Sequence, residues 1–311
     1  MGRVRIVQGS RAAGLLLGAV ADVVLGDPRR WHPVAGFGTV AGGLERRVYA
    51  DRRAAGAGYV ALLVGGAVAL GAVAEAVARR PVGRMLVTAA ATWVVLGGAS
   101  LAREGAALAG ELERGDLGAA RARLPGLCGR DPAALDAGGL ARAATESVAE
   151  NTSDAVVAPL LWGALAGVPG LLGYRAVNTL DAMVGHRSPR YLRFGWAAAR
   201  LDDVANLAPA RLGTAALIAG AALVGEDGPG AARVAWAQHR RTASPNAGWP
   251  MAAMAGALGI GLAKRGVYRL GEGALPSSPE VIRRARRVLG AAAVITVAFA
   301  AVVALVGRRA A

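Results

Sequence analysis

The stretch that decides the fold is 57–102, which reads AGYVALLVGGAVALGAVAEAVA (57–78), RRP (79–81) and VGRMLVTAAATWVVLGGASLA (82–102). Each apolar run supplies about 20 residues, enough for a helix rising about 1.5 Å per residue to cross the roughly 30 Å hydrocarbon core of a bilayer. Because the linker between the runs is so short, we expect a tight helical hairpin whose outer ends lie on the same side of the membrane.

Further apolar segments lie on either side of this hairpin. A third clear span is 288–307. The segments 155–174 and 204–224 are long enough to cross but contain prolines, so we expect kinked or re-entrant helices there. Weaker candidates are 12–26 and 249–263.

The composition supports a membrane protein and excludes several other classes. Hydrophobic residues make up 54% of the chain and charged residues only 18%, too few to cover an ordinary soluble monomer. The single cysteine, Cys128, excludes an internal disulfide and a cysteine-based metal centre. We therefore predict one all-α unit over 1–311, a polytopic helical membrane protein with broken or re-entrant helices and polar helical loops.

The net charge of +15 raises the question of nucleic-acid binding, but the residues argue against it. Lys264 is the only lysine among 36 basic residues, and aromatic residues make up only 5% of the chain, so there is no lysine-rich stripe or stacking platform. Arginines that anchor the chain against anionic lipid heads or hold anionic substrates account better for the charge. Because arginines occur in every loop, they do not settle the orientation of the spans.

Polar groups able to carry chemistry gather in four short stretches at the edges of apolar segments. The first reads GDPRRWHP at 26–33 and presents Asp27 and His32 at a membrane boundary. The alternative interpretation is a helix stop with a solvated aspartate. The segment before it has the basic start and apolar middle of a signal peptide, but it runs directly into this motif, so we expect it to be retained.

The second stretch reads RAATESVAENTSD at 142–154. On a helix, Glu146, Glu150 and Asp154 share one face, where they repel one another unless a cation or an arginine neutralises them. This pattern favours a divalent-metal or magnesium–nucleotide site with oxygen ligands. The alternative is a solvated acidic face.

The third stretch, 174–211, is the densest. Asn178 and Asp181 share a helical face, His186 follows them, and Asp202 and Asp203 add two carboxylates. The same stretch carries three arginines able to neutralise these acids or to hold phosphate through bidentate contacts, namely Arg187, Arg200 and Arg211. A structural salt-bridge network explains part of this pattern, but not the combination of a histidine, amides and acids.

The fourth stretch, SPNAGWP at 244–250, offers the Ser244 hydroxyl, the Asn246 amide, the Trp249 indole and backbone N–H groups. It is suited to cradling a phosphate or simply to capping the apolar helix that follows. The chain contains no GxxxxGK[ST] phosphate loop, HExxH zinc motif, GxSxG elbow or GxGxxG dinucleotide motif.

At these four stretches the sequence resembles the CobD/CbiB family of cobalamin biosynthesis proteins, the adenosylcobinamide-phosphate synthases. The segments that carry the resemblance are GDPRRWHPV (26–34), ARAATESVAENTSDAVVAPLLWGALAGVPG (141–170), YRAVNTLDAMVGHRSPRYLRFGWAAARLDDVANLAPARL (174–212) and SPNAGWPMAAMAGALG (244–259). Thr145 departs from the pattern, which has an aliphatic residue there. His239 does not match the motif and is given no role.

The resemblance implies a multi-pass enzyme of the cell (inner) membrane with a cytoplasmic active face. The enzyme would join adenosylcobyric acid to (R)-1-aminopropan-2-ol, or its O-phosphate, through an amide bond. Mg²⁺ and ATP as co-substrate are also implied, because a carboxylate is a poor electrophile until it is phosphorylated and metal-bound acids neutralise the transferring phosphoryl group. The partners implied are the corrinoid, the aminopropanol, the lipid bilayer and other late cobalamin-biosynthesis enzymes of the membrane, with no nucleic acid. The ATP site stays unplaced.

On the residues of this chain, the resemblance leads to the following hypothesis. The metal ligands would be Glu146, Glu150, Asp154, Asp181, Asp202 and Asp203. His32 or His186 would take a proton from the attacking ammonium, with Asp27 as a further catalytic group. The groups expected to bind substrate are Arg187, Arg200, Arg211, Asn178, Ser244, Asn246 and Trp249.

Membrane topology decides whether the four stretches can form one site. If 155–174 and 204–224 both cross fully, the third stretch lies opposite the second and fourth. We expect that neither crosses fully, or that the site is sunk between broken helices. Two other classes compete: a corrinoid or small-molecule transporter, for which buried acids and broken helices are equally natural, and a non-catalytic membrane scaffold for late cobalamin enzymes.

Overall fold

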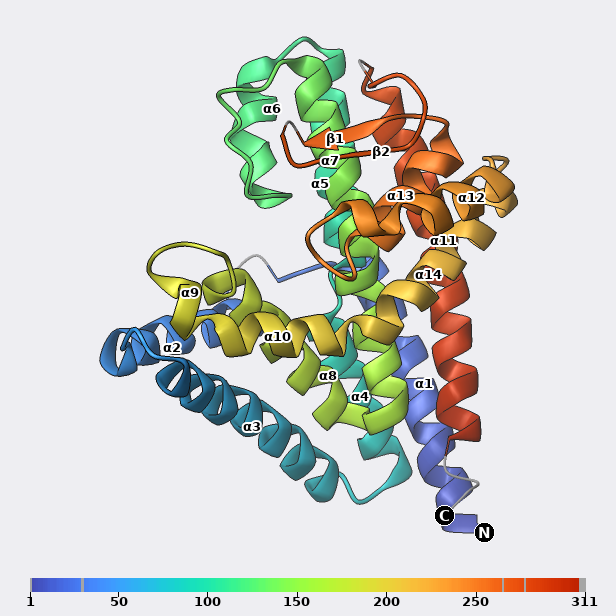
Figure 1. Cartoon of the computed structure of the whole chain (residues 1–311). Coiled ribbons are helices and arrows are strands. Elements are labelled where there is room, and N and C mark those ends of the chain that lie inside the picture. The colour runs from blue at the N-terminus through green and yellow to red at the C-terminus, as the bar shows by residue number, and fades with distance from the viewer. Residues whose placement is uncertain (1, 29–30, 265, 277, 308–311) are drawn as a thin grey trace. The chain divides into compact units, whose positions relative to one another are not determined.

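The computed structural model describes residues 2–28, 31–264, 266–276 and 278–307 (Figure 1). The described chain is helical apart from one small antiparallel sheet, which confirms the predicted all-α class. The helices are α1 (Gly2–Leu25), α2 (Pro33–Val48), α3 (Arg53–Val77), α4 (Pro81–Val95), α5 (Gly98–Glu113), α6 (Leu117–Arg123), α7 (Ala137–Thr152), α8 (Ala158–Val184), α9 (Tyr191–Phe194), α10 (Trp196–Ala205), α11 (Leu207–Leu223), α12 (Gly228–Gln238), α13 (Gly248–Leu258) and α14 (Glu280–Val306). The short elements are the 3₁₀ turns η1 (Leu124–Gly126) and η3 (His239–Arg241), the π-helix η2 (Ser153–Val157), and strands β1 (Leu262–Lys264) and β2 (Tyr268–Leu270).

Five stretches of the described chain are long and apolar enough to cross a membrane, so the chain is a multi-pass membrane protein. They are Val7–Leu25, Arg53–Val77, Pro81–Glu113, Ala137–Val184 and Glu280–Val306. The bent pair of α10 and α11 would make a sixth. The predicted spans 57–78, 82–102, 155–174 and 288–307 coincide with these stretches, and the weaker candidate 12–26 belongs to the first of them.

The candidate at 249–263 turns out differently. Its helix, α13, has only 11 residues and ends at Leu258, because Gly259 adopts a left-handed conformation with φ of 66°. The chain then enters the two-stranded sheet, which the sequence analysis does not predict.

The chain forms two compact units. The first comprises Met1–Gly97, Ala158–Asn206 and Val297–Ala311, and the second comprises Gly98–Val157 and Leu207–Thr296. The sequence predicts a single unit because no polar linker marks this division. Two of the crossings, at 157–158 and 296–297, occur inside continuous helical runs, where composition gives no signal.

In the first unit, α3 and α4 are joined by a short link but do not pack along each other (Figure 1). α4 packs on α1, where glycines let the backbones approach: a Cβ on Gly14 would lie 2.5 Å from the Cβ of Thr88. α3 packs on α8, where a Cβ on Gly71 would lie 2.7 Å from the Cα of Pro169. The expected hairpin is therefore a tight link between two helices that have different partners.

The break in α8 is held by charged side chains. Gly167 has φ of 68° and ψ of −147°, outside the helical region, and Pro169 follows it. Glu75 accepts a hydrogen bond from the freed backbone N–H of Val168 at 2.8 Å. Arg11 donates to two carbonyls of the preceding turn, each at 3.3 Å. The predicted kink is confirmed, and side chains of α1 and α3 satisfy the backbone groups that it exposes.

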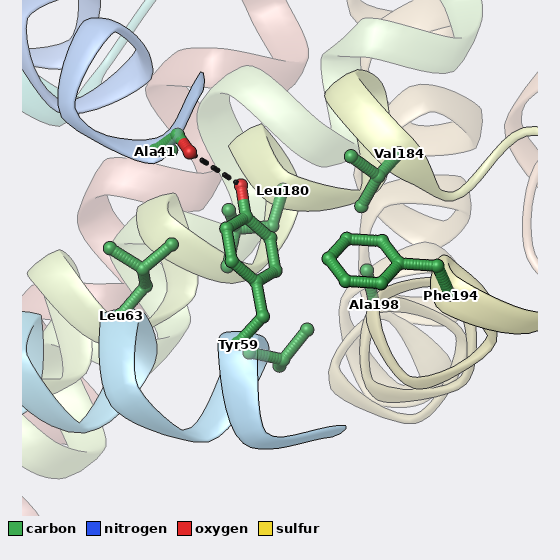
Figure 2. Packing of buried hydrophobic residues seen from close by; sticks show 8 residues of the cluster. Ala41, Tyr59, Leu63, Leu180, Val184, Phe194 and Ala198 are labelled. Atoms are coloured by element: carbon green, nitrogen blue, oxygen red, sulfur yellow. Dashed lines mark hydrogen bonds between the residues drawn. The ribbon is translucent and has the colours of Figure 1, made fainter. Parts of the chain in front are cut away.

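A buried cluster holds the second half of α8 against α2, α3 and α10 (Figure 2). Tyr59, Leu180, Val184 and Phe194 are all at most 2% exposed. Tyr59 donates a hydrogen bond to the carbonyl of Ala41 at 3.2 Å, so the one polar group of the cluster is satisfied. This packing fixes the face of α8 that carries the third polar stretch.

The second unit packs α12 closely on α13, where a Cβ on Gly256 would lie 2.3 Å from the carbonyl oxygen of Gly230. Gln238 accepts a hydrogen bond from the backbone N–H of Gly271 at 2.8 Å and so ties the end of α12 to the sheet. The carboxylate of Glu226 accepts from Arg284 of α14 at 3.0 Å. These contacts give the fourth polar stretch a rigid support.

Candidate functional site

The first unit brings together most of the third polar stretch. Asp181, near the end of α8, interacts electrostatically with Asp202 and Asp203 of α10 and with His186. Asn178, one turn before Asp181, lies beside the carboxylate of Asp202. Two helix segments that are distant in sequence thus face each other with three carboxylates and an amide between them.

Two amide side chains, Asn206 and Asn178, hydrogen-bond the Asp202 carboxylate. Asp202 Oδ2 accepts a hydrogen bond from the Asn206 amide at 3.0 Å, and Asn206 Oδ1 in turn accepts from the hydroxyl of Tyr174 at 2.9 Å. Asp202 Oδ1 is buried, and no residue in the described part of the chain donates a hydrogen bond to it. A buried carboxylate oxygen of this kind is costly unless a ligand occupies the position beside it.

Asp181 is folded back over the end of its own helix. Its Oδ1 lies so close to Gly185 that a Cβ on that residue would approach it to 1.8 Å. The absence of a side chain at Gly185 is therefore what allows the carboxylate to adopt this position. Gly195 meets the end of α8 in a similar way, since its Cβ would lie 1.7 Å from the carbonyl oxygen of Val184.

The cationic residues at this site are exposed. Arg187 interacts with Asp203, and Arg200 approaches the same carboxylate at 3.7 Å. The His186 ring is also exposed and meets the edge of Tyr191, with ring centroids 4.9 Å apart. The site therefore combines partly buried acids with accessible arginines and an accessible imidazole, which suits an anionic ligand bound through a cation.

His32 caps the helix that follows it. Its Nδ1 accepts a hydrogen bond from the backbone N–H of Val34 at 3.1 Å, so the ring hydrogen of the neutral form is on Nε2. Nε2 lies 3.9 Å from Asp27 Oδ1. His32 thus has a structural role at the start of α2, while a catalytic role for the pair stays a prediction.

In the second unit, Glu146 has internal partners. Arg130 forms an ion pair and a hydrogen bond with its Oε2, and the Tyr268 hydroxyl donates to the same oxygen at 2.8 Å. Burial and the Glu146 charge raise the pKa of Tyr268, so this hydroxyl stays protonated. The arginine that the acidic face requires is therefore present and comes from the segment before α7.

The acidic face of the second stretch is also less regular than its spacing predicts. The π-helix Ser153–Val157 begins where α7 ends, and its wider turn takes Asp154 out of the α-helical register of Glu146 and Glu150. Glu150 and Asp154 are partly exposed. No three His, Cys, Asp or Glu side chains of the described residues form a group that could hold a metal ion by themselves.

The fourth stretch forms a second cluster in the same unit. Arg211 donates a hydrogen bond to Asn246 at 3.0 Å, and its guanidinium lies 5.3 Å from the centre of the Trp249 ring. His239 stacks on that ring with centroids 3.8 Å apart. Ser244 accepts hydrogen bonds from the backbone N–H groups of Asn246 and Ala247 in the turn before α13, each at 3.2 Å. The N-cap of α13, Ala247, has no side-chain cap hydrogen bond. The stretch therefore forms a side-chain-bonded turn that presents an exposed arginine beside an aromatic stack.

The predicted site residues fall into two groups, one in each unit. The first unit carries Asp27, His32, Asn178, Asp181, His186, Arg187, Arg200, Asp202 and Asp203. The second carries Glu146, Glu150, Asp154, Arg211, Ser244, Asn246 and Trp249. Within each unit the groups described above are real neighbours, whereas one site made by both units stays a prediction.

Sequence reasoning missed Arg130, Tyr268 and His239, and it gave no role to Tyr174 or Asn206. A partner for Glu146 could have been sought among the arginines, because an acid in an apolar segment requires a cation. Nothing in the sequence pairs Glu146 with Tyr268, which lies 122 positions away. The hydrogen bond from Tyr174 to Asn206 likewise joins positions 32 apart.

The first unit also holds an apolar cavity of about 320 Å³ between α2, α3, α4 and α8. Its only polar or charged lining residues are Arg175 and Thr179, and the Thr179 hydroxyl is bound to the carbonyl of Arg175 at 2.7 Å. None of the predicted site residues lines it, so the candidate chemistry lies elsewhere.

Comparison with known proteins assigns the family. A sequence model described as CobD/Cbib protein matches residues 15–289. Cobalamin biosynthesis protein CobD of Mycobacterium tuberculosis is 56% identical over 256 residues, which cover 81% of this chain and 80% of the relative. Proteins of the same name from Geobacter metallireducens and Chromobacterium violaceum are 44% identical over 263 residues (82% of each chain) and 39% identical over 295 residues (88% of this chain, 91% of the relative). No solved structure matches the chain. The chain therefore belongs to the CobD/CbiB family of cobalamin biosynthesis proteins.

Proposed function

We propose that this protein is an adenosylcobinamide-phosphate synthase, a ligase that joins the carboxylate of adenosylcobyric acid to the amine of (R)-1-aminopropan-2-ol or its O-phosphate. The observation that carries the proposal is the convergence of Asn178, Asp181 and Asp202 in the first unit. These residues belong to the segment with the densest resemblance to the family, and an unpartnered carboxylate oxygen lies among them.

The reaction has two steps. A carboxylate oxygen of the corrinoid first attacks the γ-phosphorus of ATP, so that an acyl phosphate forms and ADP leaves. The amine nitrogen then attacks the acyl carbon, the bond from that carbon to the phosphate oxygen breaks, and inorganic phosphate leaves as the amide forms. The attacking nitrogen must lose its extra proton, so the site needs a base beside a group that tolerates phosphate charge.

Asp181 and Asp202 fit a magnesium ion. Mg²⁺ is usually held by one or two carboxylates together with phosphate oxygens and water rather than by a complete protein cage, and Asp202 Oδ1 is a buried carboxylate oxygen to which no described residue donates a hydrogen bond. When bound, the ion would neutralise charge on the transferring phosphoryl group. The Asn178 amide is placed to orient the same oxygens. A metal-ligand role for Glu150 and Asp154 within the second unit stays a prediction.

The exposed arginines supply the phosphate contacts in this proposal. Arg187 and Arg200 stand beside Asp203, where a bound phosphate would replace that carboxylate as their partner. In the second unit, Arg211 with Asn246 and Trp249 offers a further anion-binding group.

Of the two candidate bases, His186 is favoured over His32. Nδ1 of His32 is used to accept the cap hydrogen bond and its Nε2 carries the hydrogen, so no lone pair is left to take a proton in that state. His186 is exposed and interacts with Asp181, which would stabilise the imidazolium formed when it accepts a proton. Asp27 would then orient His32 rather than act on substrate.

The test is synthesis by the purified protein in detergent with adenosylcobyric acid, (R)-1-aminopropan-2-ol O-phosphate, ATP and Mg²⁺, followed by mass spectrometry of the corrinoid. The expected product is adenosylcobinamide phosphate with release of one ADP per amide. Parallel reactions with free aminopropanol identify the amine that is used. If no amide forms under any of these conditions, the proposal fails.

A second candidate function, transport of a corrinoid or another small molecule, is favoured by one observation. α8 is broken at Gly167, and charged residues from α1 and α3 lie at the break, a construction found in transporters. Uptake of radiolabelled adenosylcobyric acid into proteoliposomes without ATP or amine would support it. Ligation without uptake would exclude it. A scaffold for late cobalamin enzymes instead predicts that Asp181→Asn leaves synthesis in membranes unchanged.

A further inference from the structure

We propose that Tyr174 and Asn206 are positioning residues whose hydrogen bonds hold Oδ2 of Asp202 and thereby turn Oδ1 toward a divalent cation. Neither residue has a role in the function proposed above. The inference deepens that function, because it rests on Asp202 as a ligand, and its test separates the two.

The direction of the hydrogen bonds is dictated by the donor groups. An ionised carboxylate only accepts, so the NH₂ group of Asn206 must face Asp202 Oδ2, at 3.0 Å. The amide oxygen of Asn206 is then left to accept, and it meets the Tyr174 hydroxyl at 2.9 Å. The alternative orientation of the amide would place its oxygen against the carboxylate, which is repulsive. The chain of hydrogen bonds from Tyr174 through Asn206 to Asp202, called the relay below, therefore has only one possible set of donors and acceptors.

Burial makes the relay rigid. Asn206 is 2% exposed and Tyr174 is 4% exposed. Asn206 directly follows the last residue of α10, and its backbone N–H donates to the carbonyl of Asp202 at 2.9 Å. The neighbouring carbonyl of Ala205 accepts from the Trp162 indole of α8 at 3.1 Å. The end of α10 is thus tied to α8 by two side-chain bonds, and the side chain of Asn206 has little freedom to move.

These hydrogen bonds to Oδ2 determine where the other carboxylate oxygen of Asp202, Oδ1, lies. With Oδ2 held by Asn206, rotation of the Asp202 carboxylate is restricted. The Asn178 amide also hydrogen-bonds this carboxylate, while no described residue has the geometry to donate to the buried Oδ1. A hydrogen-bonded second residue behind a metal ligand both orients the ligand and prevents its rotation, and loss of such a partner typically weakens metal binding about 10–100-fold. The hydrogen bonds from Asn206 and Tyr174 therefore serve to keep Oδ1 of Asp202 oriented for a bound cation.

The experiment measures Mn²⁺ binding to the purified protein in detergent by electron paramagnetic resonance, without substrates. Asp202→Asn defines the signal from this site. Asn206→Leu removes both hydrogen bonds at nearly constant volume and should weaken binding about tenfold or more. Tyr174→Phe removes only the outer bond and should weaken it about threefold, since one neutral hydrogen bond is lost. Melting temperature and elution volume report whether each variant is folded.

Tyr59→Phe is the matched control. It removes another buried tyrosine hydroxyl of the same unit, bound to the carbonyl of Ala41 at 3.2 Å, with no connection to Asp202. Mn²⁺ binding and the Mg²⁺ dependence of synthesis should be unchanged in this variant. In Asn206→Leu, by contrast, saturating Mg²⁺ should restore much of the lost rate, because the defect is in cation binding.

The outcomes separate the two proposals. If Asp202→Asn loses Mn²⁺ and both Asn206→Leu and Tyr174→Phe bind it as the parent does, the positioning inference is overturned while the site stands. If Asp202→Asn retains full binding, the cation site itself is wrong. If the parent binds Mn²⁺ and the relay variants weaken it but no amide is formed, the inference holds and the proposed ligase activity fails.

Discussion

Two acidic groups of this protein look equivalent in sequence and differ in their partners. Glu146 in the second unit is paired with Arg130 and hydrogen-bonded by Tyr268. Asp202 in the first unit is held by a neutral amide and keeps one buried oxygen without a described donor. Each acid keeps one buried oxygen to which no described residue donates a hydrogen bond, Oε1 of Glu146 and Oδ1 of Asp202. Only Glu146 is paired with a cation, so only the charge of Asp202 is left for a bound cation. The difference teaches that acidic spacing alone does not separate a structural carboxylate from a candidate ligand.

The strongest test of the difference between Glu146 and Asp202 is to remove the charge of each acid by substitution with its amide. We expect Asp181→Asn and Asp202→Asn to lower the rate of amide synthesis by at least about 100-fold, since loss of an outer partner alone costs about 10–100-fold at metal sites. In the folded fraction of the Glu146→Gln protein, the rate of amide synthesis should fall by less than about tenfold. The measurement is steady-state synthesis against Mg²⁺ concentration. If Glu146→Gln loses as much activity and Mg²⁺ dependence as Asp202→Asn, the two acids are equivalent and the comparison fails.

The next largest effect concerns stability in the second unit. Arg130→Ala would leave the Glu146 carboxylate, whose side chain is 5% exposed, without its cation. Removing one partner of a buried pair destabilises by about 3–5 kcal/mol. Chemical unfolding in detergent should show this loss, and adding Glu146→Gln to Arg130→Ala should recover most of it. A stability unchanged by Arg130→Ala would mean that Glu146 has another partner, and the contrast with Asp202 would weaken.

A smaller effect is expected at the end of α8. Gly185→Ala places a Cβ where it would lie 1.8 Å from Asp181 Oδ1, so the carboxylate must move. We expect about tenfold slower synthesis, comparable with loss of an outer-shell contact. Gly58→Ala, at a glycine of α3 in the same unit with open space around it, controls for general effects of losing a glycine. Equal activity of Gly185→Ala and the parent would show that the folded-back position of Asp181 is not the active one.

The smallest effect is the acid sensitivity of the second unit. The hydrogen bond from Arg284 lowers the pKa of Glu226 below its ordinary value. Its contribution to stability is therefore full above the unfolded pKa, about 4.3, and is lost as the pH falls through the lower folded pKa. We expect Glu226→Gln to be less stable by about 1 kcal/mol at pH 7 and the gap to narrow as the pH falls below about 4. A gap of constant size over this acid range would assign the effect to packing.

Structural features that depend on residues close together in the sequence could be predicted, whereas features that depend on contacts between distant segments could not. Spans were located because a bilayer requires about 20 apolar residues in one run, and the kink at Gly167 was expected from Pro169 within such a run. The predicted hairpin of α3 and α4 has the expected short link, but the two helices do not pack along each other. Close contacts at glycines place α4 on α1 and α3 on α8 instead. The sheet of β1 and β2 escaped notice because three-residue strands leave no periodic pattern.

In the candidate site, too, features that depend on neighbouring residues could be predicted, and features that depend on distant residues could not. The third stretch was found from local composition, and the structure brings Asp181 and Asp202 together as that density suggested. The fourth stretch predicts either binding or capping. Ser244 bonds the turn before α13, and the N-cap Ala247 has no side-chain cap hydrogen bond, so neither role is confirmed. Asp154 was placed on a regular face that the π-helix interrupts, a change that depends on tertiary packing rather than on helix propensity.

The sequence by itself determined that this chain is a helical membrane protein of the CobD/CbiB family with acids and arginines at the edges of its spans. Those properties follow from run length and from motifs contained in single segments. Only the tertiary structure decided which acid is neutralised and which is left open. Arg130 and Tyr268 reach Glu146 across 16 and 122 positions, and Tyr174 reaches Asn206 across 32. Charges and hydrogen bonds act through space, so their partners are fixed by packing and not by proximity along the chain.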